Sequence, residues 1–95
     1  MIIVAGFLKV DPAERENFLI ECVEVARAAR AAEGCLDFHL SADPIDLDRV
    51  NIFEQWDSVD AVEAFRGSGP GKGQQAVIVD ARVLQYEVAG STSLT

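Results

Sequence analysis

The chain contains three side chains whose types and spacing could carry chemistry: a single histidine, a single tryptophan, and a carboxylate two residues before that tryptophan. These are His39, Trp56 and Glu54. An imidazole titrates near neutrality and can move a proton. A carboxylate can do the same where burial raises its pKa, and an indole offers a flat apolar wall for an aromatic ligand.

Glu54 and Trp56 share one side of a predicted strand over residues 50–56, because alternate strand residues face the same way. Burying a carboxylate costs several kcal/mol unless it is paired. Glu54 is therefore expected to sit at a sheet edge, to find a partner, or to line a cavity. Both aromatic groups also have purely structural explanations. Trp56 could pack in the core, and His39 could be a surface or hydrogen-bonded side chain. Glu54 could likewise form an ion pair across a dimer, with Arg49 or Arg82.

Length and composition predict a single domain over residues 1–95, with a core at 2–88 and a polar tail at 89–95. Sixteen acidic residues against eight basic ones give a net charge of −8, which disfavours binding to nucleic acid or to anionic membrane. The longest uncharged run, Met1–Leu8, is too short to span a bilayer and lacks the features of a signal peptide, so a cytoplasmic location is expected. Cys22 and Cys35 have no metal-ligand spacing and are expected to be free buried thiols.

The hydrophobic pattern predicts the order β-α-β-β-α-β, which is typical of a ferredoxin-like α+β fold with both helices on one face of an antiparallel sheet. Asp11 and Pro12 are expected to start the first helix, and Gly34 to end it. The glycine-rich segment 67–73 is a connector or a lid over a cavity, and 74–79 is either helical or extended. The predicted elements are a strand at 2–10, a helix from 11 to about 32, strands at 35–41 and 50–56, a helix from 57 or 58 to 65 or 66, and a strand at 80–88.

One face of this sheet is left without helices, and the sequence predicts that it is apolar. The first strand is apolar on both sides, and either Trp56 or Phe53 must point away from the helices because the two have opposite parity. A large bare apolar face usually marks an interface. We therefore expect a homodimer formed face to face through the two sheets, with a cavity between the sheets or within each half.

Several motifs in this order resemble the antibiotic biosynthesis monooxygenase family, small dimeric α+β barrels that include cofactor-independent quinol monooxygenases. Val10-Asp11-Pro12 follows the first strand, and Phe18 lies inside the first helix. Glu33-Gly34-Cys35-Leu36 followed by Phe38 is similar to the family's Pro-Gly-Cys-Leu-x-Tyr signature, with Glu33 in place of Pro. Glu54-x-Trp56-x-Ser58 followed by Ala61 is similar to its strongest signature, and the resemblance covers roughly residues 2–88.

The resemblance implies oxidation of a small aromatic or quinol-type substrate by O2, without flavin, haem or metal. On this basis His39, Glu54 and Trp56 are predicted to be catalytic, with His39 as the natural base. Phe7, Ile52, Trp56 and Phe65 are predicted to bind the substrate. The chain departs from the family where Phe65 replaces a frequent His and where Ile52 replaces an Asn of some members.

Two other functions fit the same scaffold, because one fold hosts many activities. The apolar residues Phe65 and Ile52, which replace a His and an Asn of other members, are compatible with a non-catalytic dimeric barrel that binds a small apolar ligand. A cofactor-free isomerase would need only His39 or Glu54 as its base and no O2.

Overall fold

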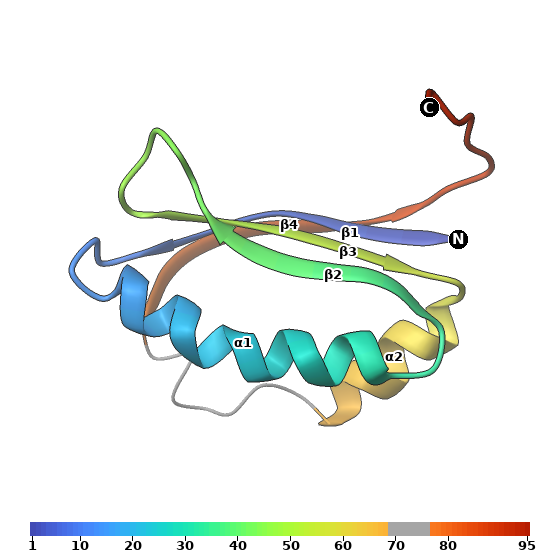
Figure 1. Cartoon of the computed structure of the whole chain (residues 1–95), viewed down its shortest axis with the longest axis horizontal. Coiled ribbons are helices and arrows are strands. Elements are labelled where there is room, and N and C mark those ends of the chain that lie inside the picture. Colours follow the sequence, from blue (N-terminus) through green and yellow to red (C-terminus); the bar gives the residue numbers. More distant parts are fainter. Residues whose placement is uncertain (69–76) are drawn as a thin grey trace.

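The computed structural model describes residues 1–68 and 77–95, and it has the predicted two-layer α+β architecture (Figure 1). Four antiparallel strands form one sheet in the order β2-β3-β1-β4, and both helices lie against the same face of it. The elements are β1 (Ile2–Val10), α1 (Arg15–Ala31), β2 (Cys35–Ala42), β3 (Arg49–Trp56), α2 (Val59–Ser68) and β4 (Ile78–Glu87).

The first helix begins later than the sequence predicts, at Arg15. The side chain of Asp11 accepts a hydrogen bond from the backbone N–H of Ala13 at 2.9 Å, and its carbonyl accepts one from Glu14 at 2.9 Å. These bonds close a turn ahead of the helix, so Asp11 caps the turn and not the helix itself. The last strand begins at Ile78, so residues 78 and 79 are extended. Residues 69–76, which include most of the glycine-rich segment, lie outside the described residues.

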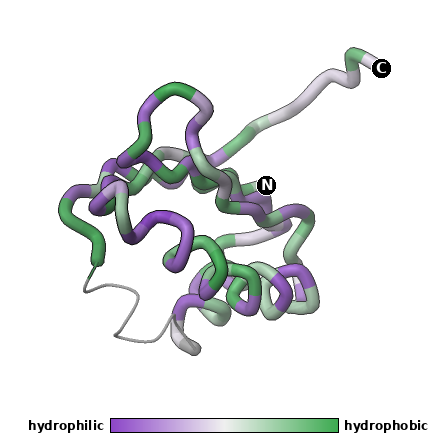
Figure 2. The backbone as a smooth tube through the Cα atoms, turned by 60° about the vertical axis from the view of Figure 1, so that its left-hand side comes forward, coloured by the Kyte–Doolittle hydropathy of each residue, from purple (hydrophilic) through white to green (hydrophobic). Residues whose placement is uncertain are grey.

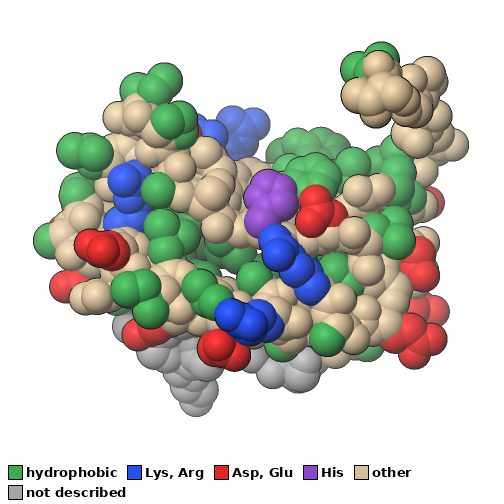
Figure 3. Space-filling view, viewed as in Figure 1, with side chains coloured by type: hydrophobic (Ala, Val, Ile, Leu, Met, Phe, Trp, Pro, Cys, Tyr) green, Lys and Arg blue, Asp and Glu red, His purple; other side chains and the backbone are tan. Residues whose placement is uncertain are grey.

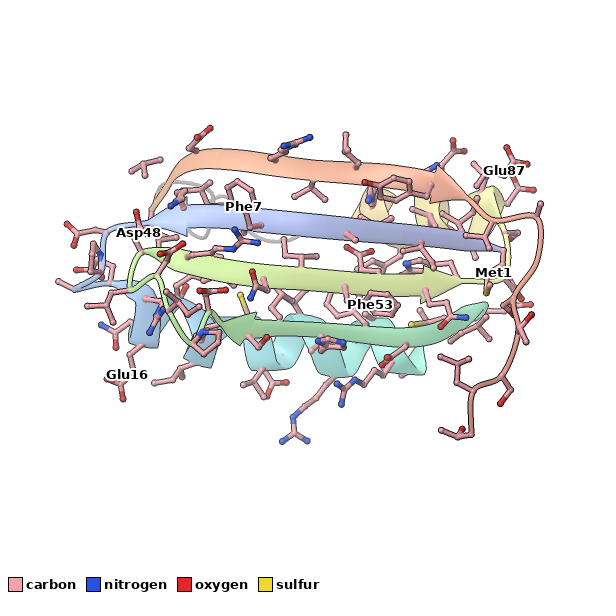
Figure 4. The ribbon with its side chains drawn as sticks, turned by 90° about the horizontal axis from the view of Figure 1, so that it is seen from above. Met1, Phe7, Glu16, Asp48, Phe53 and Glu87 are labelled. Atoms are coloured by element: carbon pink, nitrogen blue, oxygen red, sulfur yellow. The ribbon has the colours of Figure 1, made fainter. Side chains whose placement is uncertain are left out.

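Side-chain parity divides the sheet into a covered face and an open face. Even-numbered residues of β1 and β3 face the helices, and Val4, Val50 and Trp56 among them are fully buried. Their odd-numbered neighbours, such as Phe7 and Phe53, lie on the open face, seen from above in Figure 4. The core therefore lies between the sheet and the helices. Of the two residues predicted to have opposite orientations, Trp56 faces the helices and Phe53 faces away from them.

An apolar stripe runs along α1, and it is only partly covered by the sheet. Phe18, Cys22 and Ala29 are buried, but Val23 remains 46% exposed. The stripe is wider than the line of contact between one helix and the sheet, so its outer side borders solvent beside β2. Beyond β4, Val88 still donates to the carbonyl of Met1 at 2.9 Å, and the chain then leaves the sheet as an extended tail (Figure 2).

Gly6 lies in the middle of the central strand, where β4 approaches closely. Its φ is +154°, and a Cβ at this position would collide with the carbonyl oxygen of Arg82 on the neighbouring strand. Because that atom belongs to the backbone, the collision could be relieved only by moving a strand.

We expect Gly6→Ala to lower the free energy of unfolding by about 3 kcal/mol, because the added methyl group forces β1 and β4 apart. Gly90→Ala is the matched control, since nothing lies within 4 Å of the position that its Cβ would take. Urea unfolding of both variants measures the effect. Equal stability of the two variants would contradict the close approach at Gly6.

Candidate functional site

Glu54 lies in the interior of the sheet. Its strand, β3, runs between β1 and β2, and Glu54 is flanked by Val4 on one side and Phe38 on the other. The side chain faces the helices and is only 9% exposed. Of the three expectations for this carboxylate, a position at a sheet edge is therefore wrong. The ion pair with Arg49 or Arg82 was expected across a dimer and stays a prediction; within one chain the guanidinium of Arg49 stacks on Phe7 at the open face.

The partner of Glu54 is Trp56. The indole Nε1 donates a hydrogen bond to Oε1 of Glu54 at 3.0 Å, and the indole itself is completely buried. Its ring packs against Phe65 of α2 with the centroids 5.3 Å apart, and Phe65 makes an edge contact with Phe38 at 5.7 Å. Packing thus fixes the indole, and the indole in turn orients the carboxylate.

The carboxylate of Glu54 also lines a cavity of about 370 Å³ between the sheet and the two helices, here called the inner pocket. This volume is typical of pockets that bind small molecules. Ile52 and Phe65, both predicted to bind substrate, contribute to its mostly apolar wall. Arg66 of α2 supplies the positive charge of the pocket. Sequence reasoning missed Arg66, although its position directly after Phe65 at the end of a helix was an available signal.

Burial raises the pKa of Glu54, because the charged form loses its hydration. The hydrogen bond from Trp56 and the charge of Arg66 oppose this effect and are the smaller contributions. Glu54 is therefore a stronger base than an exposed carboxylate.

The thiol of Cys22, which also lines the inner pocket, has its pKa raised to about 11 by burial and by the nearby charge of Glu21. Burial likewise raises the pKa of Cys35. Neither cysteine is part of a disulfide, and thiols with a raised pKa remain protonated near neutral pH and are poor nucleophiles. Within the described residues, no group of three or more His, Cys, Asp or Glu side chains could hold a metal ion.

Two of the predicted site residues lie elsewhere. The imidazole of His39 stacks on Phe53 at the open face, with the centroids 5.4 Å apart, and its Nε2 lies 3.9 Å from Oδ2 of Asp37. The ring of Phe7 lies on the same open face, 4.3 Å from the guanidinium carbon of Arg49. The structure thus brings together Glu54, Trp56, Ile52 and Phe65, and it separates them from His39 and Phe7 by the thickness of the sheet.

Neither helix in the described part of the chain has the length and apolar composition needed to cross a membrane. Comparison with curated proteins gave no match.

The fold is shared with several solved structures. A protein of Caulobacter crescentus CB15 assigned to the antibiotic biosynthesis monooxygenases superimposes with a TM-score of 0.84 at 20% identity, covering 94% of this chain and 90% of the other. One from Nitrosomonas europaea gives 0.82 at 12% identity, with 95% and 100% covered. One from Deinococcus radiodurans gives 0.75 at 23% identity, with 100% and 99% covered.

Sequence comparison adds the family. The model of the family described as antibiotic biosynthesis monooxygenase matches residues 1–75, more than half of the chain. This match includes β1 to α2 and with them Glu54, Trp56 and Phe65. The chain therefore belongs to the antibiotic biosynthesis monooxygenase family.

Proposed function

We propose that the protein is a monooxygenase that oxidises a small aromatic substrate, of quinol or anthrone type, with O2 and without flavin, haem or metal. The observation that carries the proposal is a buried carboxylate, held by an indole N–H, in the wall of an apolar cavity of about 370 Å³. Membership of the family supports the reaction class.

Such a substrate supplies its own electrons once it loses a proton. For an anthrone-type methylene, one oxygen atom of O2 becomes the product carbonyl and the other leaves as water, so atoms and electrons balance. Glu54 takes the first proton and returns it to the departing oxygen. Arg66 at the pocket stabilises the substrate anion, and the apolar wall excludes water from it.

We assign the base to Glu54 because His39 does not line the inner pocket. Trp56 acts as a positioning residue: its N–H fixes one carboxylate oxygen and leaves the other available to the pocket. Ile52 and Phe65 provide the apolar surface against which the substrate ring packs.

We further propose that a second copy covers the open face of the sheet. Ile3, Phe7 and Phe53 are half-buried there, and Leu84 and Tyr86 are 45% and 48% exposed. Aromatic and aliphatic side chains dominate the middle of this face, and Arg49 and Arg82 lie beside Phe7. Exposed apolar side chains accompanied by arginine are typical of protein–protein interfaces.

The first prediction concerns turnover. Chelator-treated protein should consume O2 with a panel of small quinols and anthrones above a no-protein blank, and Glu54→Gln should lower the rate about 100-fold or more. A comparable loss in His39→Gln with Glu54→Gln active would move the base to His39. Quenching of Trp56 fluorescence by the panel without O2 uptake would favour a non-catalytic ligand-binding barrel, and anaerobic turnover would favour an isomerase.

The second prediction concerns the charge state of Glu54. Because its pKa is higher in the folded than in the unfolded chain, the folded chain holds the proton over the interval between the two values. The free energy of unfolding contributed by this group therefore falls as pH rises above about 4.3, the unfolded value. Glu54→Gln cannot ionise and so removes this loss. The free energy of unfolding of the variant, relative to that of the natural chain, should therefore rise from pH 4 to pH 7. Urea unfolding across that range measures it, with exposed Glu63→Gln as control; parallel profiles for the natural chain and Glu54→Gln would contradict a raised pKa.

The third prediction concerns assembly. Phe53→Asp should weaken self-association about 100-fold or more, because it buries an unpaired charge at the centre of the proposed interface. Ile20→Asp is the matched control: Ile20 is 62% exposed on α1, in the helix layer on the other side of the sheet (Figure 1). Sedimentation equilibrium distinguishes the two, and a dimer unaffected by Phe53→Asp would place the interface elsewhere.

A further inference from the structure

A second cavity lies outside the inner pocket, between α1 and the edge strand β2. This outer groove has a volume of about 420 Å³, and it shares only Cys22 and Leu40 with the wall of the inner pocket. Arg27, Arg30 and His39 line it, although the chain as a whole carries a net charge of −8. A concentration of basic groups in one cavity of an acidic protein indicates an anionic ligand.

Arg30 is already held in position for such a ligand. Its Nε donates to the backbone carbonyl of Phe38 at 2.8 Å, which fixes the plane of the guanidinium. In the described part of the chain, its two terminal nitrogens have no acceptor within hydrogen-bonding distance. A guanidinium with a fixed plane and available N–H groups is suited to bind a carboxylate in a bidentate manner.

The edge of β2 adds a backbone donor to the groove. Asp43 donates to the carbonyl of Arg49 across the hairpin, and in this register the odd-numbered residues of β2 bond to β3. The backbone groups of Phe38 and Leu40 therefore point away from β3, as the bond between Phe38 and Arg30 shows. The N–H of Leu40 is thus an edge donor next to the basic groups.

The acidic side chains near the groove form only weak ion pairs with its basic groups. Arg27 Nε lies 3.6 Å from Oε1 of Glu24, and both side chains are largely exposed, so this pair contributes little and can open. Asp37 faces His39, but its Oδ1 already accepts a hydrogen bond from the N–H of Phe38 at 2.8 Å. Figure 3 shows the imidazole (purple) beside blue basic side chains, with a red carboxylate close to both.

The remaining wall of the groove is apolar. Leu19, Val23 and Ala26 come from the outer part of the α1 stripe, which the sheet does not cover. We propose that the outer groove binds a small amphipathic carboxylate, with the anion on Arg30 and the Leu40 N–H and the apolar part against α1. This site is independent of the inner pocket and of the proposed oxidation.

The test uses 2-naphthoate as the probe and 2-naphthalenemethanol, which has the same ring system without the charge, as its control. His39 is the only histidine, so its imidazole signal in a ¹H–¹³C NMR spectrum is assigned without ambiguity, and its side chain lies in the wall of the groove. We expect a saturable shift of this signal with naphthoate, and about tenfold or more weaker binding of the alcohol.

Variants separate the groove from other locations. Arg30→Gln should weaken naphthoate binding about tenfold or more, and Arg27→Gln, a change at a highly exposed side chain, should weaken it a few-fold. Arg82→Gln on β4 is the control of equal charge and should leave the affinity unchanged. Backbone amide spectra verify that each variant is folded.

Two outcomes would overturn the proposal. Equal affinity for the alcohol would show that the anion is not recognised. A loss of naphthoate binding in Arg66→Gln, with Arg30→Gln unaffected, would place the carboxylate at the inner pocket. Neither result depends on O2 uptake, so a failure here is distinguishable from a failure of the proposed oxidation.

Discussion

The hydrogen bond between Trp56 and Glu54 is the constraint on which the arrangement of the site depends. It joins two alternate residues of an interior strand, so both side chains must face the helices. The fully buried indole would lose a hydrogen bond without an acceptor, and the carboxylate would be costly to bury without a donor. Each group thus lowers the free-energy cost of burying the other, and the ring of Phe65 on α2 packs against the indole.

The same parity separates two kinds of surface on one sheet. Even-numbered residues of β3 face the helices, and Ile52 and Glu54 among them line the inner pocket. Phe53, between these two, faces the open side and stacks with His39. A sheet is thin, but side chains on its two faces do not meet. The inner pocket and the open face can therefore serve different purposes, binding in one case and association in the other, without sharing side chains.

The sequence was sufficient for the element order, the α+β fold, and the shared orientation of Glu54 and Trp56, because these depend on local periodicity. It was not sufficient for the position of His39. In the hairpin, His39 pairs with Phe53 and not with Glu54, and a shift of one residue would have put it on the opposite face. The connection between the two strands is too long to fix that register from sequence alone. The start of the first helix could not be predicted from the sequence either. The residues that form the turn at Asp11 are of the same types that start a helix.

The chemical nature of the acceptor argues for more than packing at Glu54. The indole N–H requires an oxygen atom, and a glutamine carbonyl at this position would supply one without the cost of desolvating a charge. The structural requirement therefore explains an acceptor but not a carboxylate. What a carboxylate adds is the ability to take and return a proton, and burial raises the pKa of Glu54 toward the range where both steps are accessible. Its position in the wall of a cavity large enough for a small ring places that ability where a substrate would use it.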